Sequence, residues 1–397
     1  MLASLVQYTI SNPYHRALAL VCTCCLFLAL TAACKKQGVT NFEEEQEMIS
    51  PEDIAKNLPY TVGVYYYPWY EGDFHGGKYI REHLRPPQLP SLGEYDDRDP
   101  EVIAQHLKWS TTANVSLWVS SWWGPGRRED RTLLQHILPH EELGEMQIAL
   151  FYETSGRIPN FDDVSNVSSD ITHMSTNYFA HPNYLRIDSR PVLFVYLTRV
   201  LSRNGMLDEV IALMRKTAKT AGYDLYIVGD QVFGQPNNSS ALSLLDAVTN
   251  YDVYGSMGAQ GYAGQPAVDA YYAAQAEWQA LANAAGTAFI PAATPGFNDK
   301  GVRSVHPAMS RRLTLSSEHG TLFRAMLQQA VNHTESATGD MLLITSWNEW
   351  HEDTQIEPVI VSTPTASDVD NGAYSEGLDY EGYGERYLNI LREETTR

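Results

Sequence analysis

Short apolar runs alternate with amphipathic helical patterns along most of this chain, and that alternation limits the folds it can adopt. The runs predict eight strands at residues 62–67, 115–122, 147–152, 192–196, 225–229, 247–251, 288–293 and 341–347. The segments between them predict helices near residues 100–112, 132–137, 163–180, 207–221, 268–284 and 321–332. Eight strands with intervening helices over about 330 residues are typical of an α/β fold, a single-domain (β/α)₈ TIM barrel. A doubly wound open sheet is the alternative, but no glycine-rich phosphate loop follows the first strand.

The first 34 residues predict a targeting segment rather than part of the fold. Arg16 precedes an apolar run that reaches residue 30 and is followed by small residues before Cys34. The run is short for a membrane span, and small residues before a cysteine are typical of a bacterial lipoprotein signal. Cleavage there would leave Cys34 lipidated, so we expect an exported protein with a lipid anchor in a bacterial membrane, at the periplasm or the cell surface. An uncleaved anchor is the alternative, although Lys35 and Lys36 follow directly.

All four cysteines lie in that segment, so the mature chain would have neither a disulfide nor a thiolate metal site. Residues 35–57 contain a run of three glutamates and predict a flexible tether, which leaves residues 58–397 for one folded domain. The formal net charge of −20 argues against nucleic acid as a partner, because phosphate binding needs a basic face. An acidic chain with 24 tyrosines and 8 tryptophans suits a neutral ligand such as a sugar.

In a (β/α)₈ barrel the active site forms at the C-terminal face, from the loops that follow the strands. Aromatic side chains recur at the predicted strand ends. They include Tyr65, Tyr66, Trp69, Trp122, Trp123, Tyr251, Tyr254 and Trp350. Flat aromatic faces with hydrogen-bonding neighbours suit the C–H faces and hydroxyls of a pyranose ring. The strand ends therefore predict a sugar-binding face.

The last predicted strand leads directly into two carboxylates, Glu349 and Glu352, beside tryptophans. Glycoside cleavage needs one protonated and one ionised carboxyl group around the scissile bond. Burial against indole rings and mutual repulsion would raise the pKa of one of the two, which leaves an acid and a base. His351 lies between them in sequence and could orient one carboxylate or face away.

A metal-dependent hydrolase is the competing chemistry, with Glu349, His351, Glu352 and Asp353 as ligands. The chain has no HExxH motif and no paired histidines at ligand spacing. We therefore expect neither a metal nor another cofactor.

Five separated motifs, VYYYPWY, FHGGKYI, SWWGPG, PGFNDKGVR and WNEWHEDTQIEP, lie in order between about Thr61 and Pro358. Together they resemble glycoside hydrolase family 99, the endo-α-1,2-mannosidases and endo-α-1,2-mannanases. The resemblance implies a (β/α)₈ barrel, no metal, and hydrolysis of internal α-1,2-mannosidic or glucosyl-mannose linkages with retention of configuration.

The same resemblance implies that the substrate's own 2-hydroxyl is the nucleophile, which gives a 1,2-anhydro sugar intermediate. Glu349 would deprotonate that hydroxyl, and Glu352 would protonate the leaving oxygen and later activate water. The matched motif positions that would line the sugar subsites are Asn348, Tyr65 or Tyr66, Lys78, Tyr251 or Tyr254, and Arg303. For Lys78 an exposed loop position is the alternative.

Two positions bear on the substrate. Trp123 stands where the resemblance separates bacterial members that prefer mannose from animal members, so it favours α-mannan or high-mannose oligosaccharides. A glucosyl-mannose-cleaving enzyme and a non-catalytic glycan-binding lipoprotein are the alternatives. Asp353 departs from the family, which usually has glycine there. An additional carboxylate would raise the pKa of Glu352 if it pointed inward.

Overall fold

The computed structural model describes residues 59–236 and 241–396. The predicted signal segment with Cys34 and the predicted tether lie outside these residues and stay predictions. Within the described segments, no helix is both long and apolar enough to cross a membrane.

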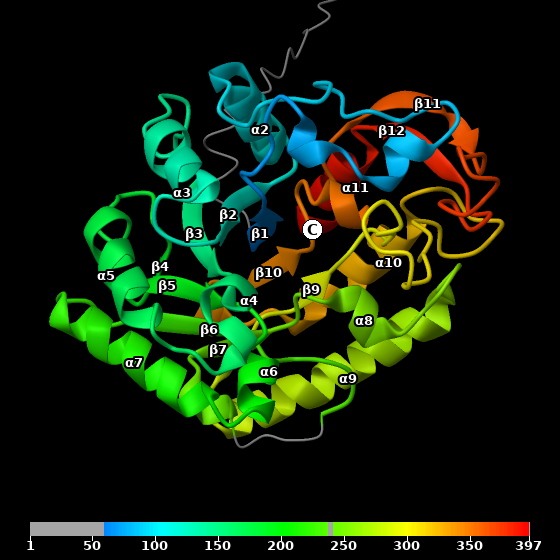
Figure 1. Ribbon diagram of the computed structural model, residues 1–397. Helices are drawn as coiled ribbons and strands as arrows, with labels where there is room; N and C mark the ends of the chain where they lie inside the picture. The colour runs from blue at the N-terminus through cyan, green and yellow to red at the C-terminus, as the bar shows by residue number, and fades with distance from the viewer. Residues whose placement is uncertain (1–58, 237–240, 397) are drawn as a thin grey trace, which may run out of the picture. The chain divides into compact units, whose positions relative to one another are not determined.

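One parallel sheet forms the centre of the fold, in the order β8-β7-β6-β5-β3-β2-β1-β10-β9 (Figure 1). Its strands are β1 (Thr61–Tyr66), β2 (Val115–Trp122), β3 (Gln147–Tyr152), β5 (Arg190–Val195), β6 (Tyr226–Asp230), β7 (Ala247–Thr249), β8 (Ala288–Phe289), β9 (Ala292–Ala293) and β10 (Met341–Ile344). The short β4 (Arg186–Ile187) pairs antiparallel with β5. These strands confirm the eight predicted ones, because β8 and β9 together occupy the predicted strand 288–293.

The split between β8 and β9 also closes the sheet. Pro291 lies between them and has no N–H to donate to a neighbouring strand. Ile290 N donates to Val248 O of β7 at 2.9 Å, and Leu343 N of β10 donates to Pro291 O at 3.0 Å. The segment therefore bonds to β7 on one side and β10 on the other, which completes a (β/α)₈ barrel.

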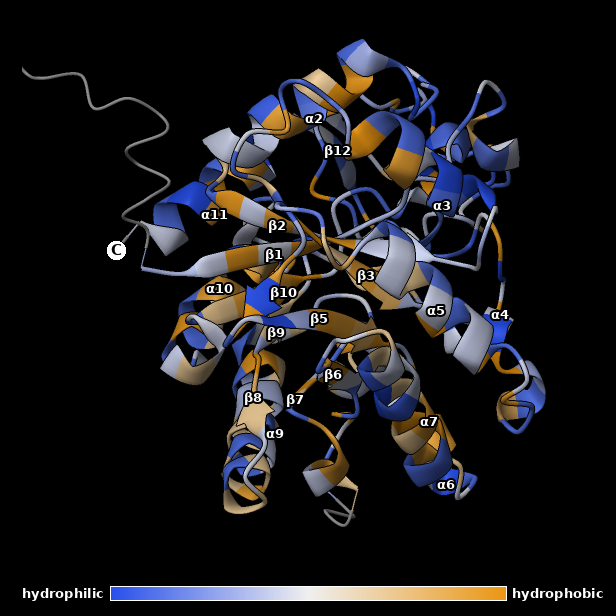
Figure 2. Cartoon of the chain, turned by 90° about the vertical axis from the view of Figure 1, so that its left-hand side faces the viewer, coloured by the Kyte–Doolittle hydropathy of each residue, from blue (hydrophilic) through white to orange (hydrophobic). Residues whose placement is uncertain are grey.

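Helices pack around the barrel where the sequence predicts them. They are α2 (Pro100–Thr112), α3 (Arg128–Thr132) with a π-turn at Leu133–Ile137, α5 (Val167–Asn177), α7 (Leu207–Thr220), α9 (Gly264–Ala284) and α10 (Thr321–Ala330). Helix α2 begins at Asp99, whose side chain accepts a hydrogen bond from Glu101 N, with Pro100 as the first helical residue. Helix α7 buries Val210, Ile211 and Met214 and has a mixed hydrophobic and hydrophilic surface in Figure 2.

Several elements go beyond the predicted set. Three short helices, α4 (Thr154–Arg157), α6 (Thr198–Arg203) and α8 (Val253–Met257), follow strands β3, β5 and β7. After the barrel, β11 (Val359–Thr365) and β12 (Tyr380–Gly384) form an antiparallel pair, and α11 (Arg386–Thr395) follows. Tyr383 and Tyr387 from this C-terminal part lie against the Arg311 guanidinium, 5.1 and 4.8 Å from its carbon to their ring centroids. Strand β12 and helix α11 thus pack on the loop that precedes α10.

Candidate active site

Glu349 and Glu352 lie on one side of a single 3₁₀ turn, Trp350–Glu352, which begins at Glu349. Side chains three residues apart eclipse one another in such a turn. The loop that carries them is closed at its base, because Ser346 Oγ accepts from Glu349 N at 2.8 Å and bonds Thr354 Oγ1 at 2.9 Å. Local hydrogen bonds directly after β10 therefore fix the two carboxylates near each other.

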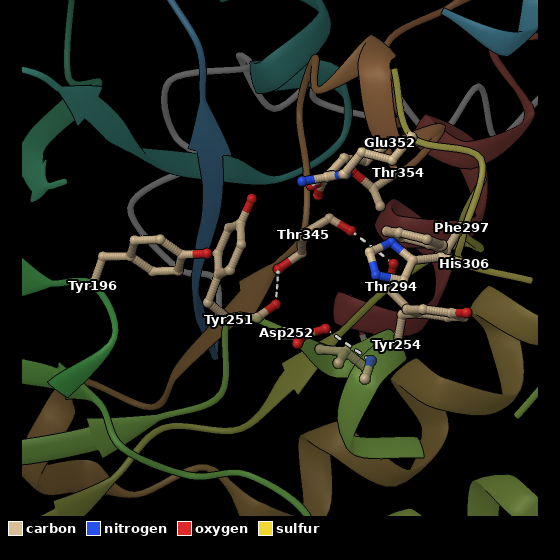
Figure 3. A pocket seen from close by; sticks show the side chains of 13 residues that line it. Tyr196, Tyr251, Asp252, Tyr254, Thr294, Phe297, His306, Thr345, Glu352 and Thr354 are labelled. Atoms are coloured by element: carbon tan, nitrogen blue, oxygen red, sulfur yellow. Dashed lines mark hydrogen bonds and ion pairs between the residues drawn. The ribbon is translucent and has the colours of Figure 1, made fainter. Parts of the chain in front are cut away.

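A cavity of about 240 Å³ opens beside Glu352 at the C-terminal ends of the strands (Figure 3). Its lining is rich in aromatic and hydroxyl side chains. The lining residues are Tyr196, Tyr251, Asp252, Val253, Tyr254, Gly255, Thr294, Phe297, Arg303, His306, Thr345, Glu352 and Thr354. Tyr254 and Phe297 stack with ring centroids 3.8 Å apart, so they present a rigid aromatic wall. The cavity lies where the strand-end rule predicts a sugar site.

Glu352 is a carboxyl group that can hold a proton near neutral pH. Burial and the neighbouring Glu349 carboxylate raise its pKa to about 7, while Arg303 opposes the shift. Arg303 Nη2 lies 2.5 Å from Glu352 Oε1, and its Nε lies 2.5 Å from Asp299 Oδ2. The side chain of Arg303 is about half exposed (47%), so a bound ligand can reach this ion pair.

Glu349 is 3% exposed and pairs with His351. Its Oε1 accepts from His351 N at 3.0 Å and from His351 Nδ1 at 3.1 Å. Burial lowers the pKa of His351, but the hydrogen bond to Glu349 and the charge of Glu349 outweigh it and raise the pKa above its ordinary value. A carboxyl group paired with a histidine, beside a second carboxyl group whose pKa is about 7, is an arrangement that suits acid–base chemistry.

Two further groups, Tyr67 and Glu153, belong to this site but were not among the predicted site residues. Tyr67 Oη lies 2.5 Å from Tyr251 Oη, and burial and the charges of Glu349, Glu153 and Glu352 raise its pKa. Glu153 accepts from Ser121 Oγ at 2.7 Å, and burial raises its pKa to about 8. Tyr67 is the first residue after β1 and Glu153 is the first residue after β3, so both lie where the strand-end rule places site residues.

Neither Tyr65 nor Tyr66 is among the residues that line the cavity beside Glu352, and their side chains point to opposite faces of β1. Tyr66 points out to the helix layer, where its ring stacks on Trp118 and its hydroxyl bonds His106 Nδ1 at 3.1 Å. Tyr65 points into the barrel and packs edge-on against Tyr251, 4.9 Å between centroids. The third consecutive tyrosine, Tyr67, is the one whose hydroxyl lies near enough to Glu349 and Glu352 for their charges to raise its pKa.

Three other residues that were predicted to contact the sugar do not line the cavity and instead bond to protein groups around the site. Trp122 is buried and donates to Asp130 Oδ1 at 2.9 Å, and Trp350 is buried and donates to Glu357 Oε2 at 2.8 Å. The Asn348 side chain bonds both the N and the O of Tyr67, at 2.8 and 3.1 Å. It therefore couples the end of β1 to the turn that carries the carboxylates.

The remaining predicted positions lie in or near the site. Tyr251, Tyr254 and Arg303 line the cavity, as given above. Trp69 is partly buried beside Tyr67, with 4.7 Å between ring centroids. Trp123 is partly buried and donates to Ser121 Oγ at 2.9 Å, the same hydroxyl that donates to Glu153. Lys78 is exposed on its loop. Its backbone packs closely against Gly301, because a Cβ atom added to Gly301 would lie 2.1 Å from Lys78 O.

Asp353 faces away from Glu349 and Glu352, so its carboxylate does not point inward toward them. It is 1% exposed and ion-paired to Arg81 at 2.5 Å and Arg311 at 3.1 Å. Burial raises the pKa of Asp353, but Arg311 and Arg81 outweigh burial and lower it below its ordinary value. Its φ of +50° is a conformation that glycine adopts freely. A metal site that includes Asp353 does not match this geometry, because two guanidinium groups occupy its carboxylate.

The sequence model of glycosyl hydrolase family 99 matches residues 81–394. Glycoprotein endo-alpha-1,2-mannosidase of Mus musculus is 24% identical over 368 residues, 83% of this chain and 74% of the relative. The Rattus norvegicus protein of the same name is 25% identical over 364 residues, 82% of this chain and 73% of the relative. The solved GH99 endo-alpha-mannosidase of Bacteroides thetaiotaomicron superimposes with a TM-score of 0.56 at 20% identity, and the match covers 85% of this chain and 98% of that one. That likeness shows the fold, and the family match covers well over half of the sequence, so this chain belongs to glycosyl hydrolase family 99 and is a glycoside hydrolase.

Proposed function

We propose that this protein is a retaining, endo-acting α-mannosidase that cleaves internal α-1,2-mannosidic linkages in α-mannan or high-mannose glycans. The observation that carries the proposal is the turn at residues 349–352, which sets the carboxyl group of Glu349, paired with His351, beside that of Glu352, whose pKa is about 7. The aromatic and hydroxyl lining next to Glu352 suits a sugar ring. The mouse and rat relatives are named endo-alpha-1,2-mannosidases, which supports the α-1,2 linkage.

In the first step, Glu349 takes the proton of the 2-hydroxyl on the sugar at the cleavage point. The resulting O2 attacks C1 of the same ring, and the bond between C1 and the glycosidic oxygen breaks. Glu352 gives its proton to that leaving oxygen. The nucleophile is held on the sugar itself, so it needs only a positioned base. The product of this step is a 1,2-anhydro sugar, with Glu349 protonated and Glu352 ionised.

In the second step, Glu352 takes a proton from water, whose oxygen attacks C1 from the face that the leaving group left. The C1–O2 bond breaks, and O2 takes back its proton from Glu349. Both carboxyl groups return to their starting states, and one water has been added across the glycosidic bond. Two displacements at C1 give retention of configuration. Glu352 must be protonated at the start, so we expect activity to fall as the pH rises through about 7.

The test is the product profile on α-1,2-linked mannotetraose, followed by NMR from the first minutes of reaction. We expect release of disaccharides rather than free mannose, with the new reducing end formed first as the α-anomer. A counterpart that carries glucose at the non-reducing end is the second substrate. We expect slower cleavage of it, because the family resemblance associates a tryptophan at the position of Trp123 with a preference for mannose. Release of mannose only, or a first-formed β-anomer, would contradict the proposal.

A further inference from the structure

The carboxylate of Glu349 is held asymmetrically. Within residues 59–236 and 241–396, both hydrogen bonds to this carboxylate end at Oε1, one from His351 N and one from His351 Nδ1. A carboxylate oxygen has two lone-pair directions, so two donors occupy Oε1 fully. The other oxygen, Oε2, keeps its lone pairs for a ligand.

The His351 ring lies between two acceptors. One nitrogen, Nδ1, faces Glu349 Oε1 at 3.1 Å, and the backbone of Gly77 also raises the pKa of the ring. A neutral imidazole has one N–H and one acceptor nitrogen, so it can donate to only one acceptor. Two acceptors beside the ring therefore favour the doubly protonated imidazolium. Aromatic rings fix its plane, since Tyr70 stacks with it at 6.0 Å and 9°, and Trp69 meets it edge-on at 5.9 Å.

We propose that His351 is a positioning residue that stays protonated and occupies Oε1 of Glu349, so that Oε2 is the atom that accepts the proton of the sugar's 2-hydroxyl. This inference rests on the proposed function and names the working atom of its base. His351 does not touch the substrate and neither gains nor loses a proton during the two steps. Its two donors keep the carboxylate from rotating, and its positive charge attracts the negative charge of the carboxylate.

Other titratable groups face Glu349 and His351 from the same turn and from the segments that follow three strands. They are Glu352 on the same turn, Tyr67, Tyr70 and His75 after β1, Glu153 after β3 and Tyr251 after β7. Glu153 and Glu352 repel negative charge on Glu349 when they are ionised. Burial and the His351 cation lower the pKa of His75, whose ring lies 5.0 Å from that of His351. Of the two imidazoles, His351 is thus the one whose pKa is raised.

The kinetic test compares His351→Asn, which keeps an amide donor near the Nδ1 position without charge, with His351→Leu, which keeps neither. We expect kcat to fall about tenfold in His351→Asn and about 10²- to 10³-fold in His351→Leu, with KM changed less than about threefold. The acidic limb of the kcat/KM profile reports protonation of the base in the free enzyme, and it should move up by about one pH unit in both variants. A residue that only stabilises the fold would lower Tm and leave this limb in place.

His173→Asn is the matched control, because it breaks a histidine–carboxylate pair of similar length, 2.9 Å to Asp130 Oδ1, on helix α5. It should leave the acidic limb where it is in the wild type. If His351→Leu does not fold, ¹⁵N NMR of histidine in the wild-type enzyme decides. Both His351 nitrogens should carry protons at pH 7, and Glu349→Gln should lower the titration midpoint of His351.

An unmoved acidic limb in both variants, or a His351 ring that is neutral at pH 7, would overturn the inference and leave the proposed function standing. A wild-type enzyme that does not cleave α-1,2-linked mannosides would instead overturn the proposed function. In that case the NMR titration still tests whether His351 holds Glu349, since it needs no substrate.

Discussion

Replacing Glu349 or Glu352 by glutamine is expected to lower kcat on α-1,2-linked mannotetraose by about 10³-fold or more, with little change in KM. The amide has nearly the same size as the carboxyl group but can neither take the 2-hydroxyl proton nor give one to the leaving oxygen. Both side chains are held by contacts that an amide oxygen partly keeps, from His351 N to Glu349 and from Arg303 to Glu352. Initial rates measured with a reducing-end label would check this.

The two variants should differ on a glycosyl fluoride, whose leaving group needs no protonation. Glu352→Gln should recover much of the first step there, while Glu349→Gln should not, because the 2-hydroxyl still needs a base. Glu318→Gln, on an exposed loop, is the control and should be as active as the wild type. Wild-type turnover of mannotetraose by either active-site variant would contradict the assigned roles.

Replacing Asp353 by glycine is expected to lower the free energy of unfolding by about 3–5 kcal/mol, because it removes the carboxylate shared by two buried arginines. Arg81 is fully buried and Arg311 is 3% exposed, so neither guanidinium can turn to solvent without unpacking its surroundings. The positive φ of Asp353 favours glycine by itself, yet the loss of two ion pairs should outweigh that gain. Urea unfolding at pH 7, with the slope compared between variants, measures the difference.

Asp188→Gly is the matched control, since Asp188 also has a φ of +50° but lies exposed in the turn between β4 and β5. It should change stability by less than about 0.5 kcal/mol. The lowered pKa of Asp353 means that its contribution is present above the ordinary carboxyl pKa and is lost as the pH falls through the lowered value. The gap between Asp353→Gly and the wild type should therefore narrow in acid. Equal stability at pH 7 would show that the arginines find other partners.

The barrel could be predicted from the sequence because its strands are continuous apolar runs, the pattern of parallel strands that are buried on both faces. Strand β2 and helix α2 agree with their predicted bounds residue for residue. The C-terminal hairpin was harder to recognise, since most of β11 is exposed or partly exposed and has no apolar period. Its packing on Arg311 depends on a contact between segments that are far apart in sequence.

The candidate acid and base could be predicted because they follow the last strand directly, whereas the direction of each neighbouring side chain could not. Three consecutive tyrosines gave no signal for which one reaches the carboxylates, and the answer depends on β1 ending at Tyr66. Asp353 was ambiguous for another reason. Its partners Arg81 and Arg311 lie 272 and 42 residues away in the sequence. Buried ion pairs of this kind leave no local pattern.

In the proposed mechanism the sugar's 2-hydroxyl, and no enzyme carboxylate, attacks C1. Intact-protein mass spectrometry tests this step most directly, after incubation with an α-mannosyl fluoride oligosaccharide whose reacting sugar carries fluorine in place of the 2-hydroxyl. We expect no cleavage and no gain in protein mass, because the nucleophile is missing. A protein that gains the mass of the glycosyl group, with the modification located on Glu349, would contradict it.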